Sequence, residues 1–464
     1  MKNKKIGVYA LLMINLIAID SLRNIPLTAP AGILVIGMYI VGILIFFIPC
    51  AIATGELSSK WPLMGGISCW VEEAAGKDMS FFVIWMQWIY NLVWFPSITA
   101  FAATQLAYSI ESTNSSALIL SSNPIYITII CLALFWLATF INSFGMKPAS
   151  ILSNCGALIG TLFPMILIII LGAIWIFSGN PTHITSIKET VHQGSVLGLF
   201  VVVLFSLMGL EMSATHAEEV KNPKKDFPKS LWLTVILIPI SLILANIAIA
   251  LVVPPSMIDP TAGLMQSFDA FFRSFNITWM DEIMALTLFL GAFAGIGAWS
   301  FGLSRYLNKA AQSGYMPKSL IKTNKSNVPA NAMFFQAVIV SFISLIYLWM
   351  PTIQSAYWFL SDLTAQLALI SYIIFFISAI ILRKKYAWDK DKNYSFARKN
   401  ISIFFYYLGV VGSIAGIIAG FILPGNDMMP LWEFDLMLII GILITLIIPY
   451  IIIKKKSLKN KAHV

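Results

Sequence analysis

The sequence predicts an all-α integral membrane protein with twelve transmembrane helices, and three observations lead to this fold class. Hydrophobic residues make up 59% of the 464 residues and charged residues only 11%, whereas a soluble domain carries about 25% charged residues. The mean hydropathy is +0.84. Long uncharged runs separate the charges, and most can hold the helix of about 20 apolar residues that crosses a bilayer. A water-soluble fold is therefore excluded.

The spans follow one another along the chain with short links. An interrupted apolar stretch starts at Ile6 and forms the first predicted span. The uncharged runs after it are 26–55, 79–110, 112–146, 148–187, 190–210, 230–258, 283–304, 326–361, 363–382, 400–426 and 436–453. Pro351 divides the run 326–361 between two spans because proline interrupts a helix. The longest external link, 254–282, is expected to form a short helical hairpin.

The basic residues predict the orientation. The net charge is +9, and nearly all of the 30 lysines and arginines fall in links on one side, with only Lys188 and Arg273 on the other. Cytoplasmic links of membrane proteins are enriched in lysine and arginine. Both termini of a twelve-span protein are therefore expected on the cytoplasmic side of the plasma (inner) membrane. In this interpretation the basic residues orient the protein, and Lys454–Lys456 could also contact anionic membrane lipid. Nucleic acid is not an expected partner.

Four ionisable residues fall inside predicted spans: Asp20, Arg23, Glu211 and Asp362. A charge that faces lipid costs about 3 kcal/mol or more, so such residues normally face a cavity or each other. Alternatives remain open for each. Asp20 and Arg23 are three residues apart and could neutralise one another, Glu211 could be protonated in a packed core, and Asp362 could reach external water. Glu56 ends a span and is expected to need no special role.

Two spans are expected to be broken. Pro26 and Pro30 each remove a backbone donor from the first span, and Gly209 weakens the sixth. Broken backbone at membrane depth persists only where it lines a cavity or is buried in protein. Interruptions in the first and sixth spans indicate a five-plus-five inverted repeat with a substrate site between the halves. The expected divisions are residues 1–194, residues 195–399, and residues 400–464 with the last two spans and a short basic tail.

The sequence offers no constellation for catalysis or metal binding. The histidines, His183, His192, His216 and His463, are scattered and lack metal-ligand spacing. The four cysteines lie in or near apolar runs without paired spacing. We therefore expect no enzyme activity, no cofactor and no metal.

One segment carries a family resemblance. Residues 209–228, GLEMSATHAEEVKNPKKDFP, resemble the sixth-span signature of the amino acid–polyamine–organocation superfamily, closest to its bacterial glutamate/GABA antiporter branch. Residues 261–268 (TAGLMQSF), 304–317 (SRYLNKAAQSGYMP) and 327–329 (NVP) agree with that branch. The resemblance implies a LeuT-type fold and exchange of amino acids by alternating access. It also implies substrate-site roles for Glu211, Trp299 and Tyr372.

The chain departs from the family pattern at four positions. Gly295 stands where the family has a second cavity glutamate, and Ala368 where it has another tenth-span tyrosine. Arg23 stands in place of a first-span tyrosine, and Asn154 in place of a fifth-span lysine near the ion site of relatives. These departures put glutamate/GABA selectivity in doubt but leave the expected fold and mode of transport unchanged.

The expected substrate site comprises Asp20, Arg23, Asn24, Ser206, Gly209, Glu211, Trp299, Asp362 and Tyr372. Arginine offers planar, bidentate donors to a carboxylate, so our hypothesis is that Arg23 favours a polar or acidic amino acid. Asp20, Glu211 or Asp362 could accept its amine. In a competing arrangement Arg23 pairs with Asp20 or Glu211 in the empty site.

The function expected from these residues is secondary active amino acid transport by an antiporter. Glu211 is the candidate proton carrier. Two other functions stay open, namely a proton-coupled amino acid importer and a sensor that binds an amino acid without translocating it.

Overall fold

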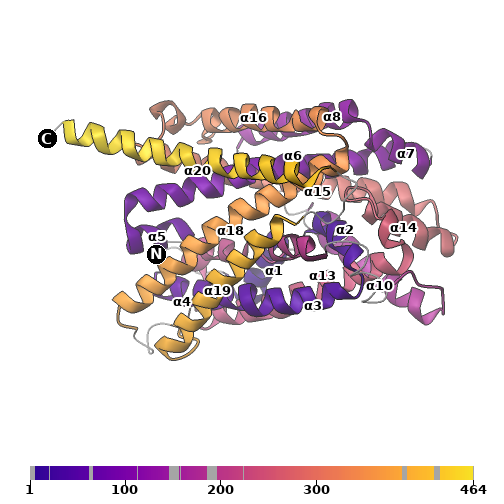
Figure 1. Cartoon of the computed structure of the whole chain (residues 1–464), viewed down its shortest axis with the longest axis horizontal. Helices are drawn as coiled ribbons and strands as arrows, with labels where there is room; N and C mark the ends of the chain where they lie inside the picture. The colour runs from indigo at the N-terminus through magenta and orange to yellow at the C-terminus, as the bar shows by residue number, and fades with distance from the viewer. Residues whose placement is uncertain are drawn as a thin grey trace.

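The computed structural model is a bundle of helices (Figure 1) and describes residues 6–19, 21–61, 66–111, 113–145, 156, 158–184, 196–222, 224–388, 394–422 and 429–462. Within these ranges no sheet forms, and a single isolated bridge joins Ile6 to Val220. Ten helical segments there are long and apolar enough to cross a membrane.

Ten predicted crossings correspond to these segments. They are α3–η3–α4 (Leu34–Gly42, Ile43–Phe47, Ile48–Lys60), α6 (Lys77–Ile110), α8 (Pro124–Ser143), η4–α10 (Leu158–Leu162, Phe163–Phe177), α13 (Asp226–Val252), α15 (Met280–Gln312), α16–α17 (Ala330–Ser344, Ile346–Trp349), α18 (Ile353–Lys385), α19 (Lys399–Gly420) and α20 (Leu431–Ala462). Shorter elements connect them: α5 (Ile67–Ala75), α7 (Asn114–Ser121), η5 (Val196–Gly198), η7 (Pro255–Met257), α14 (Gly263–Ser274) and η8 (Lys318–Ile321).

The other two predicted crossings, the first and the sixth, are the ones expected to be broken, and both are interrupted. α1 (Val8–Ile19) ends, and the chain resumes as η1 (Leu22–Asn24), α2 (Ile25–Thr28) and η2 (Ala29–Ala31). α12 (Leu199–Phe205) ends, and η6 (Leu210–Glu219) begins after a short non-helical stretch. Gly209 lies in that stretch with a φ of 110°, which a residue with a side chain rarely adopts.

Sequence chemistry explains where individual helices start. Asn123 precedes α8, and its Oδ1 accepts hydrogen bonds from the backbone amides of Ile125 and Tyr126 at 2.9 and 3.2 Å. Thr352 caps α18 in the same way, because its hydroxyl accepts from the amide of Ser355 at 3.0 Å. Such caps satisfy amides that have no partner within the helix.

Two crossings contain a π-helical segment that ends two residues before a proline. η3 precedes Pro49, and η4 precedes Pro164. Proline cannot donate to the carbonyl four residues earlier, and π segments accommodate such local defects. The π segment η4 packs against α15 where Gly160 of η4 meets Gly291 of α15. A Cβ built on Gly291 would lie 2.5 Å from the Cα of Gly160.

This glycine contact yields a stability prediction. Gly291→Ala is expected to lower the free energy of unfolding by about 1–3 kcal/mol, because the added methyl forces α15 away from η4. Gly295, one turn later on α15, is the matched control, since a Cβ there meets nothing within 4 Å. Thermal unfolding of both variants in detergent measures the difference. Equal transition temperatures would contradict the close helix contact.

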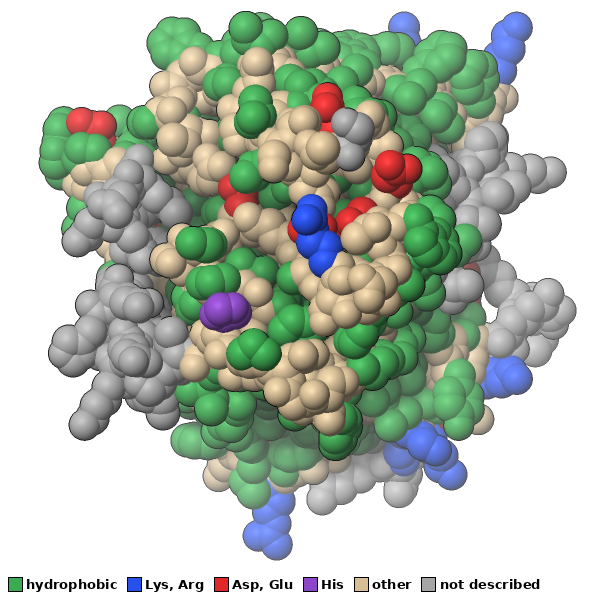
Figure 2. Space-filling model, turned by 90° about the vertical axis from the view of Figure 1, so that its right-hand side faces the viewer, with side chains coloured by type: hydrophobic (Ala, Val, Ile, Leu, Met, Phe, Trp, Pro, Cys, Tyr) green, Lys and Arg blue, Asp and Glu red, His purple; other side chains and the backbone are tan. Residues whose placement is uncertain are grey.

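One end of the bundle carries α7, α10 and α14 (Figure 1). The predicted helical hairpin in the link 254–282 is instead a 3₁₀ turn, η7, followed by the single helix α14. In the face seen in Figure 2, acidic side chains gather near a basic one. On α14, Arg273 donates to Asp269 at 2.5 Å. Salt-bridge formation with Asp269 raises the pKa of the largely exposed Arg273 guanidinium.

Candidate functional site

A cavity of about 150 Å³ lies between the two interrupted segments. The first segment contributes residues on both sides of its break, including Ile19, Ser21 and Arg23. The sixth segment does the same, with Phe205 and Glu211. Helices α6, α15 and α18, together with η4, complete the wall. The two breaks predicted from sequence therefore meet at one cavity.

Arg23 is the basic residue of the cavity lining. Its side chain is 1% exposed, and its Nη1 donates to the hydroxyls of Ser97 (2.7 Å) and Ser361 (3.2 Å). These serines lie on α6 and α18, so the guanidinium links the first segment to both helices. Its own backbone carbonyl accepts from the hydroxyl of Tyr357 at 3.2 Å, which fixes the first segment to α18.

The guanidinium of Arg23 lacks a negatively charged partner among the described residues. Its Nε and Nη2 are buried and make no hydrogen bond there. Three aromatic rings surround it, those of Trp94, Phe205 and Tyr357, with centroids 5.6–5.8 Å from its central carbon. Cation–π contacts stabilise a buried cation partly, but a buried charge normally requires a counter-charge. Arg23, which lines the cavity, therefore has two buried N–H groups without a partner among the described residues.

Glu211 is the acidic residue of the described cavity lining. Its Oε2 accepts a hydrogen bond of 2.5 Å from the hydroxyl of Tyr372 on α18. That hydroxyl in turn accepts from the amide of Gly209 at 2.8 Å. The left-handed backbone of Gly209 thus turns an amide freed by the helix break toward Tyr372. Glu211 makes no ion pair with any described residue.

The other predicted site residues are distributed differently. Asn24 and Trp299 line the cavity, and the Oδ1 of Asn24 is buried without a partner in the described part of the chain. Ser206 does not line it, and its hydroxyl donates to the carbonyl of Val202. Tyr372 reaches the site through Glu211. Asp20 lies outside the described residues.

Asp362 is placed away from the cavity. Its side chain is 1% exposed, so it does not reach external water. The Oδ1 accepts from Gln366 at 3.2 Å, and a Cβ on Gly420 would lie 2.6 Å from it. Asp362 therefore faces α19, whereas its neighbours on α18, Thr364 and Ala368, line the cavity.

Two of the family departures also lie in the cavity wall. Gly295 and Ala368 line it, and the space beside Gly295 is open to 4 Å. Asn154 lies outside the described residues. Small side chains at these two positions leave room around Arg23 and Glu211 that larger residues would fill.

Several lining residues were not predicted. Asn91 and Trp94 on α6 line the cavity, and the ring of Trp94 meets that of Trp299 at 6.0 Å. Ser97 and Ser361 hold Arg23. Asn91 is a polar residue in an apolar span, which is a usable signal, but buried serines are too common to stand out. No group of three described residues could hold a metal ion.

Comparison with known proteins decides the family. A family model described as amino acid permease matches residues 7–448. The chain belongs to the amino acid permease family. The permease is thus a multi-pass membrane protein of the amino acid–polyamine–organocation superfamily, as the sixth-span resemblance predicted, and its relatives are transporters.

Three relatives illustrate the similarity of the permease. An uncharacterized transporter of Legionella pneumophila is 40% identical over 97% of both chains. A glutamate/gamma-aminobutyrate antiporter of Lactococcus lactis is 28% identical over 97% of the permease and 91% of the relative. The putrescine transporter PotE of Escherichia coli is 23% identical over 72% of the permease and 75% of the relative.

Proposed function

We propose that the permease is a secondary active antiporter that exchanges amino acids by alternating access. The observation that carries this proposal is the shared cavity, in which two interrupted crossings bring Arg23 and Glu211 to one small space. Its volume of about 150 Å³ equals that of about five water molecules in the liquid, which suits a small polar molecule.

The proposed binding mode follows from the unused polar atoms. A substrate carboxylate binds Nε and Nη2 of Arg23, the planar pair suited to bidentate contact. The substrate ammonium binds the free Oδ1 of Asn24 or the carboxylate of Glu211. Arg23 has no ion pair with a described acidic residue. A substrate with a side-chain carboxylate therefore brings a second negative charge close to the guanidinium. We infer that acidic amino acids are preferred over their amides.

The proposed topology has twelve crossings, with residues 1–194 and 195–399 as inverted repeats and residues 400–464 outside them. The two interrupted segments support this arrangement, since broken helices at matching places mark the site of such repeats. The lysine and arginine distribution supports cytoplasmic termini in the plasma membrane. Figure 2 then views the external end.

Exchange in proteoliposomes tests the function. Purified permease is reconstituted into vesicles loaded with unlabelled amino acid, and uptake of the labelled amino acid is measured against a panel that includes glutamate, glutamine, aspartate and asparagine. We expect counterflow, and faster exchange of the acids than of their amides. Uptake only into empty vesicles under an imposed proton gradient would identify an importer. Binding without any flux would identify a sensor.

A further inference from the structure

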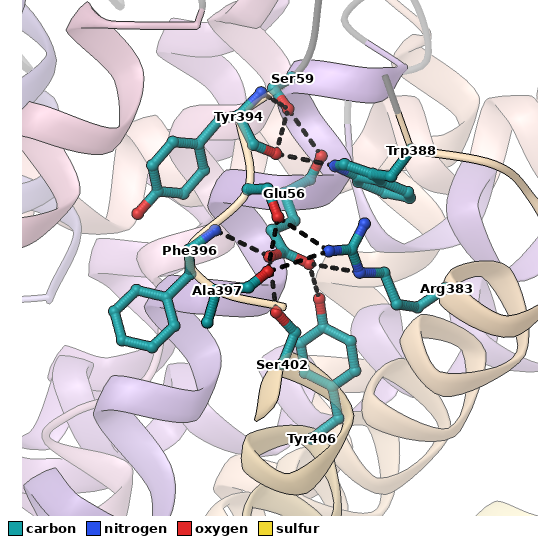
Figure 3. A network of polar contacts seen from close by, with 10 residues as sticks. Glu56, Ser59, Arg383, Trp388, Tyr394, Phe396, Ala397, Ser402 and Tyr406 are labelled. Atoms are coloured by element: carbon teal, nitrogen blue, oxygen red, sulfur yellow. Dashed lines mark hydrogen bonds and ion pairs between the residues drawn. The ribbon is translucent and has the colours of Figure 1, made fainter. Parts of the chain in front are cut away.

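A buried polar cluster joins α4, α18 and α19 at the end of the bundle that we propose is cytoplasmic (Figure 3). Its centre is Glu56 on α4, which is fully buried. From the sequence, Glu56 ends a span and needs no special role, whereas the structure buries it fully inside this cluster. The Nε of Arg383 on α18 lies 3.3 Å from Oε2 of Glu56, with side chains 4% and 0% exposed.

Besides this ion pair, three groups donate hydrogen bonds to the Glu56 carboxylate. The amide of Phe396 and the hydroxyl of Ser402 donate to Oε1 at 2.9 and 2.8 Å, and the hydroxyl of Tyr406 donates to Oε2 at 2.5 Å. Oε1 therefore accepts two hydrogen bonds, and Oε2 accepts one beside its ion pair with Arg383. We name Glu56, Arg383, Ser402 and Tyr406 the clasp.

Arg383 is itself fixed on its other sides. Its Nη2 donates to the hydroxyl of Ser395 at 2.8 Å, and the ring of Trp388 covers its central carbon at 4.3 Å. The indole of Trp388 donates to the carbonyl of Tyr394 at 2.8 Å, and the amide of Tyr394 donates to Ser59 on α4. The end of α18 is thus joined to α4 by two routes, the Glu56–Arg383 ion pair of the clasp and the contacts through Trp388, Tyr394 and Ser59.

The same face of α18 reaches the cavity. Tyr372, which contacts Glu211 and Gly209, precedes Arg383 by close to three helical turns, or about 16 Å. α4 packs against η6, the segment that carries Glu211, as well as against α18. The contacts therefore form a closed circuit from Glu211 through Tyr372 and α18 to Arg383, then through Glu56 and α4 back to η6.

We propose that Glu56 and Arg383 are positioning residues that hold α18 against α4 and thereby hold Tyr372 on Glu211 in the cavity. The role in substrate binding rests on the proposed function, whereas the positioning of Tyr372 does not. A tilt of the cytoplasmic half of α18 relative to α4 changes the Arg383–Glu56 contact and the Tyr372–Glu211 contact together. The clasp therefore sets the position of Tyr372 and Glu211 when substrate binds.

Double-mutant cycles test this coupling, since residues about 16 Å apart without a shared partner normally contribute additively. Tyr372→Phe is combined with Arg383→Gln, and the thermal transition in detergent is measured for all four proteins. We expect the substitution Tyr372→Phe to lower the transition temperature clearly more in the wild-type background than in the Arg383→Gln background. Additive losses would overturn the proposal whether or not the protein transports.

Transport supplies a second readout on the same proteins. Arg383→Gln is expected to raise the apparent KM of exchange about 3- to 30-fold, the range by which remote residues modulate a site. Arg383→Lys keeps the charge and should stay within about threefold of the wild type. Lys385→Gln removes an exposed charge two residues away and should change nothing. An unchanged KM in folded Arg383→Gln would contradict the role in binding.

A milder variant covers the case in which Arg383→Gln does not fold. Tyr406→Phe removes one donor from Glu56 without leaving an unpaired charge. In the double-mutant cycle of Tyr406→Phe with Tyr372→Phe, the losses in transition temperature should again be non-additive. The control cycle combines Lys385→Gln with Tyr372→Phe, and its losses should be additive. If the Tyr406→Phe cycle were additive as well, the clasp would be rejected as a positioning device. A wild type that exchanges no amino acid would refute the proposed function alone.

Discussion

Arg23→Gln is expected to lower the rate of amino acid exchange about 10- to 100-fold and to abolish the preference for acids over amides. Arg23 lines the cavity, and its buried Nε and Nη2 lack partners among the described residues. A hydrogen bond to a charged group contributes about 1.5–3 kcal/mol, and this range gives the expected loss. Exchange of glutamate and glutamine in proteoliposomes, for wild type and variant, measures it.

The stability of the empty protein separates a binding role from a structural one. If Arg23 awaits a substrate anion, its removal relieves a buried, incompletely compensated charge, so Arg23→Gln should unfold at the same temperature as the wild type or higher. Arg23→Lys is the control: it keeps a cation but loses the planar fork, and intermediate exchange is expected. A destabilised Arg23→Gln with unchanged selectivity would remove Arg23 from the site.

The competing arrangement pairs Arg23 with Asp20 in the empty cavity, and it makes an opposite prediction. Removing one partner of a buried ion pair leaves the other uncompensated. Arg23→Gln and Asp20→Asn would then each destabilise the protein, and the double variant would be more stable than either single variant. Thermal unfolding of these three proteins distinguishes the two arrangements.

The broken crossings could be predicted because their causes are local. A glycine, two prolines and charges at membrane depth are visible in single segments, and the interruptions occur shortly before Pro26 and at Gly209. The other ten crossings follow from hydropathy, together with Pro351 as the boundary between two of them. The bounds were less predictable, because several helices extend past the apolar run into charged residues, as α18 does to Lys385.

The composition of the site was harder to predict because it depends on which face of a helix points inward. Asp362 was expected to accept a substrate amine, yet it faces α19 while Thr364 on the same helix lines the cavity. Most faces of α18 are buried, so its apolar periodicity does not indicate which face lines the cavity. The Glu56–Arg383 pair was missed because its partners lie on helices far apart in the sequence.

Glu211→Gln is expected to make exchange of acidic amino acids nearly independent of pH. Arg23 and Glu211 are the charged residues in the described cavity lining, so the charges of these side chains cancel when Glu211 is ionised and leave a positive cavity when it is protonated. A positive cavity binds an anionic substrate better. Wild-type exchange should therefore rise as the pH falls through the pKa of Glu211, and the variant should stay near the acid-side rate throughout.

Tyr372→Phe is the matched control for this pH experiment. It keeps the ring and the carboxylate but removes the 2.5 Å hydrogen bond to Glu211 and the acceptor for the amide of Gly209. Because its carboxyl still titrates, exchange by Tyr372→Phe should remain pH-dependent, with a displaced midpoint. Initial exchange rates from pH 5 to 8, at equal pH on both sides of the vesicle, measure both variants. If Glu211→Gln kept the wild-type profile, the titrating group would have to be sought outside the cavity, and Glu211 would serve only to bind the substrate amine.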